Sequence, residues 1–162
     1  FKQIFSPQTA YQMTSILEGA IQRGTGKRLR DLNLQIAGKT GTTNNNTDTW
    51  FIGFTSNLVV GVFVGYDSPK KLGKYETGSK TALPIFKEFI KNAVKNYEAR
   101  PFKISKGIKM MVIDAETGKK ADFGSKKTII ESYKKEKFEN QTFISNDKYK
   151  SDIYKKNILK FY

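Results

Sequence analysis

The 162-residue sequence predicts an α+β fold in which an antiparallel three-strand meander is flanked by helices. Two segments repeat apolar residues every three or four positions, which is typical of amphipathic helices. Between them lie three short runs rich in β-branched and aromatic residues, separated by turn-forming residues. This order of elements predicts one unit over residues 1–100 and a C-terminal extension over residues 101–162 that ends in a Lys-rich tail.

The first predicted helix covers residues 7–23. Ser6 can cap its first turn, and Pro7 suits the first helical position, where no backbone N–H donor is needed. The glycines of Gly24-Thr25-Gly26 end it. We expect its apolar face to be buried, and that face consists of Ala10, Met13, Leu17, Ala20 and Ile21.

Three strands are predicted next, over residues 34–42, 49–55 and 58–66. Residues 43–48 are polar and rich in asparagine, so they form a loop between the first two strands. Ser56-Asn57 leaves room only for a tight turn, which predicts a hairpin of the second and third strands.

The alternation of the second strand places Trp50, Ile52 and Phe54 on one face and Phe51 on the other. Trp50 could line a ligand groove, but we expect it to belong to the core, where large aromatic residues are more often found.

The second helix is predicted over residues 81–97, with Pro84 in its first turn. Its apolar stripe consists of Phe86, Phe89, Ile90, Ala93, Val94 and Tyr97. The chain changes character at Arg100-Pro101, after which we expect one strand over residues 109–114. Beyond Ser125 the sequence is Lys-rich with no sustained period, so we expect a flexible or only locally ordered tail.

Composition excludes several classes of function. The chain has no histidine and no cysteine, so a Ser-His-Asp triad is impossible and no metal or cofactor is expected. The net charge of +14 comes mainly from lysines spread along the chain. Such a charge favours any polyanion at low salt, but specific nucleic-acid binding is not expected. No apolar run is long enough to span a bilayer, so any anchor or targeting segment would lie upstream.

The stretch 37–43 is the candidate binding segment, although Lys-Thr-Gly taken alone is also compatible with an ordinary strand. Gly38 and Gly41 leave no side chain in the way of a ligand lying along the strand, and Lys39 supplies a cation. Thr40 and Thr42 alternate with Gly41, so their hydroxyls share one face. A strand edge with a cation, two hydroxyls and free backbone N–H groups suits a peptide carboxylate, which could add to the edge as an extra strand.

Several ordered motifs together resemble class A penicillin-binding proteins, closest to their bifunctional 1A type. The Lys-Thr-Gly motif is one of the signature motifs of that group. The resemblance covers about residues 3–120, and its most specific parts are Ser6–Met13, Ala37–Thr43, Asp48–Phe54, Val60–Asp67, Glu76–Gly78 and Ala82–Phe86.

The resemblance implies a D-Ala-D-Ala transpeptidase that cross-links peptidoglycan stem peptides by serine acyl transfer and is trapped by β-lactams. It implies that Lys39 helps to hold the terminal carboxylate and completes a hydrogen-bonded network with a serine of the family's second motif. The hydroxyls of Thr40 and Thr42 would bind the carboxylate alongside Gly41, and the Thr42 N–H would be an oxyanion-hole donor. It also implies the periplasmic side of the bacterial inner membrane.

The family's serine nucleophile is missing from its expected place. No Ser-x-x-Lys or Ser-x-Asn motif precedes Lys39. The downstream matches to Ser-x-x-Lys are expected by chance in so Lys-rich a chain, and they are Ser68 with Lys71, Ser132 with Lys135 and Ser145 with Lys148. We therefore expect an upstream transpeptidase half carrying Ser-x-x-Lys to be the partner. The alternatives are a non-catalytic remnant or assembly module of a split penicillin-binding protein and, more distantly, a basic polyanion-binding domain.

Overall fold

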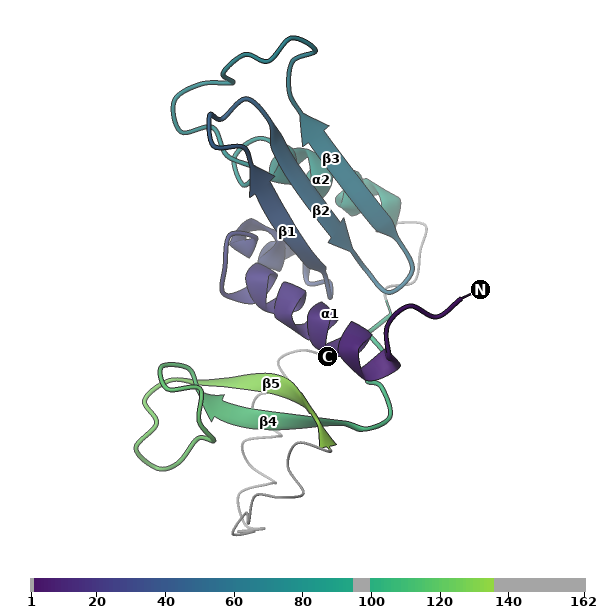
Figure 1. Ribbon diagram of the computed structural model, residues 1–162, viewed down its shortest axis with the longest axis vertical. Helices are drawn as coiled ribbons and strands as arrows, with labels where there is room; N and C mark the ends of the chain where they lie inside the picture. The colour runs from purple at the N-terminus through teal and green to yellow at the C-terminus, as the bar shows by residue number, and fades with distance from the viewer. Residues whose placement is uncertain (1, 95–99, 136–162) are drawn as a thin grey trace.

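The computed structural model describes residues 2–94 and 100–135, and it confirms the α+β class (Figure 1). The elements in chain order are α1 (Pro7–Gln22), the 3-10 helix η1 (Lys27–Leu32), β1 (Ala37–Thr42), β2 (Thr49–Phe54), β3 (Val59–Val64), α2 (Ala82–Ala93), β4 (Ile108–Asp114) and β5 (Thr128–Lys134). Figure 1 shows α1 between the three-stranded sheet and the β4–β5 hairpin, with α2 covering the far face of the sheet.

Helix α1 begins where its capping residue predicts. The Ser6 hydroxyl accepts the Thr9 N–H at 3.2 Å, which satisfies a backbone donor that the first helical turn leaves unpaired. The predicted apolar face is only partly right. Ile21 is buried, but Met13 is half exposed, because the N-terminal half of α1 contacts the hairpin through polar side chains rather than through this stripe.

The three-strand meander is confirmed, with the order β1-β2-β3 and both pairs antiparallel. Phe51 of β2 is fully buried and packs edge-on against Phe86 of α2, with ring centroids 4.6 Å apart. These rings lie in a core made of Ile21, Leu29, Ile36, Phe51, Ala82, Leu83, Phe86 and Ile90. The expectation that Trp50 is a core residue is wrong: it is 44% exposed, because the strand alternation turns it to the face opposite α2.

The C-terminal part contains one strand more than the sequence predicts. The expected strand is present as β4, and it pairs with β5, which occupies part of the stretch expected to be a flexible tail. The hairpin is bound to α1 by side chains: Gln12 donates to the Ser132 carbonyl at 3.0 Å and Arg23 pairs with Glu131 at 2.7 Å. Because tertiary contacts stabilise β5, the Lys-rich local composition is a poor guide to its structure. The rest of the predicted tail, residues 136–162, lies outside the described residues.

Candidate active site

The candidate site is the outer edge of β1, which has no strand partner among the described residues. The N–H of Thr43 donates to the Asp48 carbonyl at 3.0 Å, so it points toward β2. Successive N–H groups of an extended strand point in opposite directions. The N–H groups of Thr42 and Thr40 therefore point to the open edge, where an extended ligand could receive them.

The Lys39 ammonium lies at the same edge. Its Nζ donates to the Thr40 carbonyl oxygen at 3.0 Å and to the Thr40 hydroxyl at 3.2 Å. The side chain is exposed, and its partners belong to the neighbouring residue rather than to an acidic group. The cation is thus held at the strand edge, and no carboxylate of the described residues neutralises it there.

Two contacts hold the hydroxyls of Thr40 and Thr42, and they come from segments outside the strand. Thr25, between α1 and η1, places its hydroxyl 2.9 Å from that of Thr40. The N–H of Gly78 donates to the Thr42 hydroxyl at 3.1 Å. The structure therefore brings together all four residues predicted from the motif, 39–42, and adds Thr25 and Gly78 as their neighbours.

Gly78 has to be glycine because of its approach to the sheet. A Cβ on it would stand 2.4 Å from the Trp50 carbonyl oxygen and 2.7 Å from that of Gly41. The segment 76–78 therefore packs directly on β1 and β2 and then leads into α2, whose Leu83 N–H donates to the Gly78 carbonyl at 2.8 Å. Thr25 is not singled out as a site residue by the sequence. Gly78 belongs to the segment Glu76–Gly78, whose resemblance to a family segment places it near the rim of the site, with a turn role as the equal alternative.

The serines matched by chance do not complete this site. Ser132 is buried in β5, on the other side of α1 from the sheet (Figure 1). Ser68 lies in the exposed loop that follows β3, and Ser145 falls outside the described residues. Among the described residues no cluster of His, Cys, Asp and Glu could hold a metal ion.

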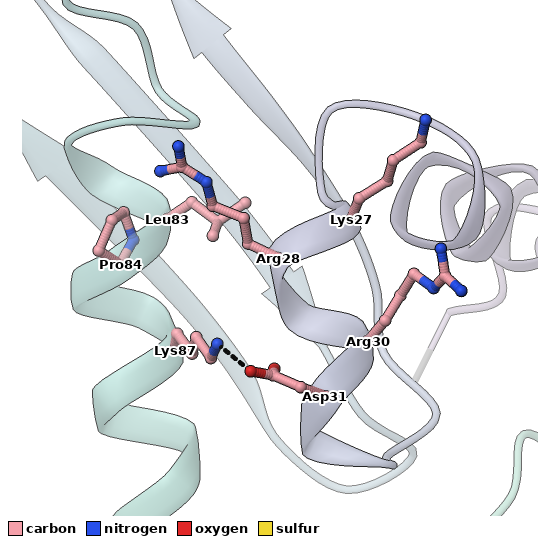
Figure 2. Close-up of a pocket in the computed structure, with 7 residues that line it drawn as sticks. All are labelled: Lys27, Arg28, Arg30, Asp31, Leu83, Pro84 and Lys87. Carbon is pink, nitrogen blue, oxygen red and sulfur yellow. Dashed lines mark hydrogen bonds and ion pairs between the residues drawn. The ribbon is translucent and has the colours of Figure 1, made fainter.

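A separate surface pocket lies between η1 and α2 and is strongly basic. Its volume is about 660 Å³, and it is lined by Lys27, Arg28, Arg30, Asp31, Leu83, Pro84 and Lys87. Figure 2 shows Lys87 reaching across from α2 to Asp31 of η1, while Arg30 points away from α2. The hydrogen bond from Lys87 holds the pKa of the Asp31 carboxyl below its ordinary value. The pocket is lined by η1 and α2, and none of its lining residues belongs to β1.

The sheet face opposite α2 is apolar and open. Ile52 and Phe63 are about half exposed there, and Trp50 packs on Phe63 with ring centroids 4.8 Å apart. The strand register places these side chains on the same face as Lys39, since Lys39 pairs with Ile52. Within the part of the chain that the structure describes, no helix is long and apolar enough to cross a membrane.

The comparisons with known proteins agree on one family. The penicillin binding protein transpeptidase domain family matches residues 1–91. Penicillin-binding protein 1A of Rickettsia conorii is 49% identical over 84% of this chain, and that of Pseudomonas aeruginosa is 40% identical over 83%. The chain spans only 17% and 16% of the lengths of these two relatives.

A solved structure supports the same assignment. The crystal structure of penicillin-binding protein 1A from Haemophilus influenzae superposes with a TM-score of 0.69 and 31% identity, over 78% of this chain and 20% of that one. The family match covers more than half of the chain, and the relatives and the shared fold indicate the same family. This chain belongs to the penicillin-binding protein transpeptidase family, as a C-terminal part of a class A transpeptidase domain.

Proposed function

We propose that this chain forms one wall of a peptidoglycan D-Ala-D-Ala transpeptidase site whose serine nucleophile lies outside the chain. The observation that carries the proposal is the grouping of a cation, two hydroxyls and outward N–H groups along the open edge of β1. An extended stem peptide that ends in a carboxylate suits such an edge, because backbone pairing gives affinity and the cation gives specificity.

Each group has a defined role in serine acyl transfer. Lys39 would hold the terminal carboxylate of the stem peptide or of a β-lactam, with the hydroxyls of Thr40 and Thr42 donating to the same carboxylate. The serine would attack the carbonyl of the D-Ala-D-Ala bond, and the N–H of Thr42 would donate to the oxyanion that forms. One such donor is worth roughly 3–4 kcal/mol of transition-state stabilisation in other acyl-transfer enzymes.

The partner that supplies the serine is an upstream transpeptidase half carrying Ser-x-x-Lys. Two features of the structure support this partner. The apolar face around Trp50, Ile52 and Phe63 is open, and β3 has no strand on its outer side among the described residues. Unpaired strand edges and large apolar faces are normally covered in stable proteins. The complete enzyme would act on the periplasmic side of the inner membrane, where its peptidoglycan substrate lies.

The test is covalent labelling with a fluorescent penicillin, applied to this chain alone and to this chain combined with the upstream polypeptide. We expect the upstream polypeptide to be labelled in the combination. Lys39→Ala should slow labelling about 10- to 100-fold, since a hydrogen bond to a charged group is worth about 1.5–3 kcal/mol. Lys119→Ala is the matched control, because Lys119 is exposed in the loop between β4 and β5.

The outcomes separate the candidates. Labelling that depends on Lys39 and not on Lys119 supports a transpeptidase site built from two segments. Absence of labelling in every combination refutes the enzyme and favours a non-catalytic remnant or assembly module, for which the open apolar face would be the docking surface. Labelling of this chain itself would show that one of its own serines is the nucleophile.

A further inference from the structure

We propose that Thr25 is a positioning residue that turns the hydroxyl hydrogen of Thr40 toward the ligand carboxylate. This inference rests on the proposed function and deepens it, because it assigns the direction of a proton in the carboxylate site. It starts from the contact of the Thr25 and Thr40 hydroxyl oxygens at 2.9 Å, in which either oxygen could be the donor.

The Lys39 ammonium decides between the two directions when an anion is bound. A hydroxyl has one hydrogen to donate and two lone pairs to accept with, whereas an ammonium only donates. Lys39 therefore fills one lone pair of the Thr40 oxygen, at 3.2 Å. If Thr40 donated to Thr25, its single hydrogen would point at Thr25. A lone pair of the Thr40 oxygen would then face the ligand, and this lone pair would repel a carboxylate. If Thr25 donates to Thr40, both lone pairs are filled and the Thr40 hydrogen is left for the ligand.

The neighbouring hydroxyl is arranged in the same way. The Thr42 oxygen accepts the N–H of Gly78 at 3.1 Å, and a backbone N–H cannot reverse its role. The hydrogen of Thr42 is therefore also free to donate. Two hydroxyls on one strand face, each already accepting a hydrogen bond, form a pair of donors that suits the two oxygens of one carboxylate. Thr25 and Gly78 thus select an anionic ligand end over a neutral one.

The experiment compares two acylating agents that differ only at the carboxylate: benzylpenicillin, which carries it, and its methyl ester, in which it is neutral. Rate constants for acylation are measured for the complete protein, in which this chain is joined or combined with the segment carrying the serine. The variants are Thr25→Val, which keeps the shape and removes the hydroxyl, and Thr25→Ser, which restores it. Thr55→Val is the matched control, because the Thr55 hydroxyl bonds Asn57 in the β2–β3 turn, away from Thr40.

We expect Thr25→Val to slow acylation by benzylpenicillin about five-fold, the usual worth of one hydrogen bond, and to leave the ester unchanged. Thr25→Ser and Thr55→Val should both behave as the unmodified protein. Because unfolded molecules react with neither agent, the ratio of the two rate constants reports only on folded protein. A ratio that Thr25→Val leaves unchanged would overturn the role of Thr25. An unmodified protein that reacts with neither agent would instead overturn the proposed function itself.

Discussion

Replacing Gly78 with alanine tests how tightly the segment before α2 packs on the candidate site. The added Cβ would meet the carbonyl oxygens of Trp50 and Gly41 at 2.4 and 2.7 Å. Both contacts are with backbone atoms of paired strands, so no side chain can rotate away to make room. The segment itself would have to lift off the sheet.

The size of the displacement follows from the contact distances. Ordinary van der Waals contact begins near 3.5 Å, so Gly78 must move by about 1 Å from the Trp50 oxygen. The same movement stretches its bond to the Thr42 hydroxyl from 3.1 Å to beyond hydrogen-bond range. Overpacking of this kind costs about 1–3 kcal/mol of unfolding free energy. A shift of about 1 Å in a binding group can lower a rate about 100-fold.

The assay uses the complete protein, in which this chain is joined or combined with the segment carrying the serine. It measures the rate of acylation by a fluorescent penicillin and the urea unfolding midpoint of the same preparation. Gly124→Ala is the control, because its Cβ would meet only the Asp122 side chain at an ordinary 3.4 Å. We expect Gly78→Ala to slow acylation 10- to 100-fold and to lower stability, with Gly124→Ala changing neither. A Gly78→Ala variant whose acylation rate and urea unfolding midpoint equal those of the unmodified protein would refute the inferred close packing of Gly78.

Two further predictions concern stability. Burial raises the pKa of the Glu18 carboxyl above its ordinary 4.5, so the folded chain binds the carboxyl proton more tightly than the unfolded chain does. The folded state therefore loses stability as the pH rises from the unfolded pKa through the higher folded pKa. Glu18→Gln should therefore unfold at higher urea than the unmodified chain at pH 7, an advantage that denaturation curves should show disappearing as pH falls to about 4. The Thr81 hydroxyl donates to the Thr77 carbonyl at 3.0 Å, so the buried Thr49 hydroxyl, 2.6 Å from it, must be the donor of their shared bond. Thr81→Val leaves that buried donor unpaired and should cost about 1–3 kcal/mol in urea denaturation, whereas Thr49→Val should cost about 0.5–1.5 kcal/mol, and equal losses would contradict this assignment.

The parts of the fold that the sequence predicts well are those that local pattern determines. The alternation of β2 separates Phe51 from Trp50, and the Ser6-Pro7 pair marks the start of α1, and both features are confirmed. The strand that carries Lys39 is also where the motif predicts it. These features depend on residues a few positions apart, so the sequence contains all the information that they need.

The remaining features depend on contacts between distant segments. The Thr25 and Thr40 hydroxyls are 15 residues apart, and Gly78 is 36 residues from Thr42, so no local pattern connects them. Strand β5 is likewise held by its pairing with β4 and by side chains of α1 such as Gln12. Trp50 is misassigned for a related reason, because residue type indicates burial while the position of α2 decides which face of the sheet is covered.

The state of Lys39 gives a second, independent reason why this edge would select an anion. In the structure its ammonium is satisfied by the Thr40 carbonyl at 3.0 Å, so a ligand at the edge has to compete with that bond. A neutral carbonyl or amide offers an acceptor of the same kind and gains little from the exchange. A carboxylate offers a charge-assisted bond, which is roughly twice as strong, so it can replace the Thr40 carbonyl as a partner while the ammonium keeps its bond to the Thr40 hydroxyl. In the proposed site the cation at the edge of β1 would therefore favour anionic ligands, because only a ligand that carries its own negative charge gains from displacing the backbone partner that Lys39 already has.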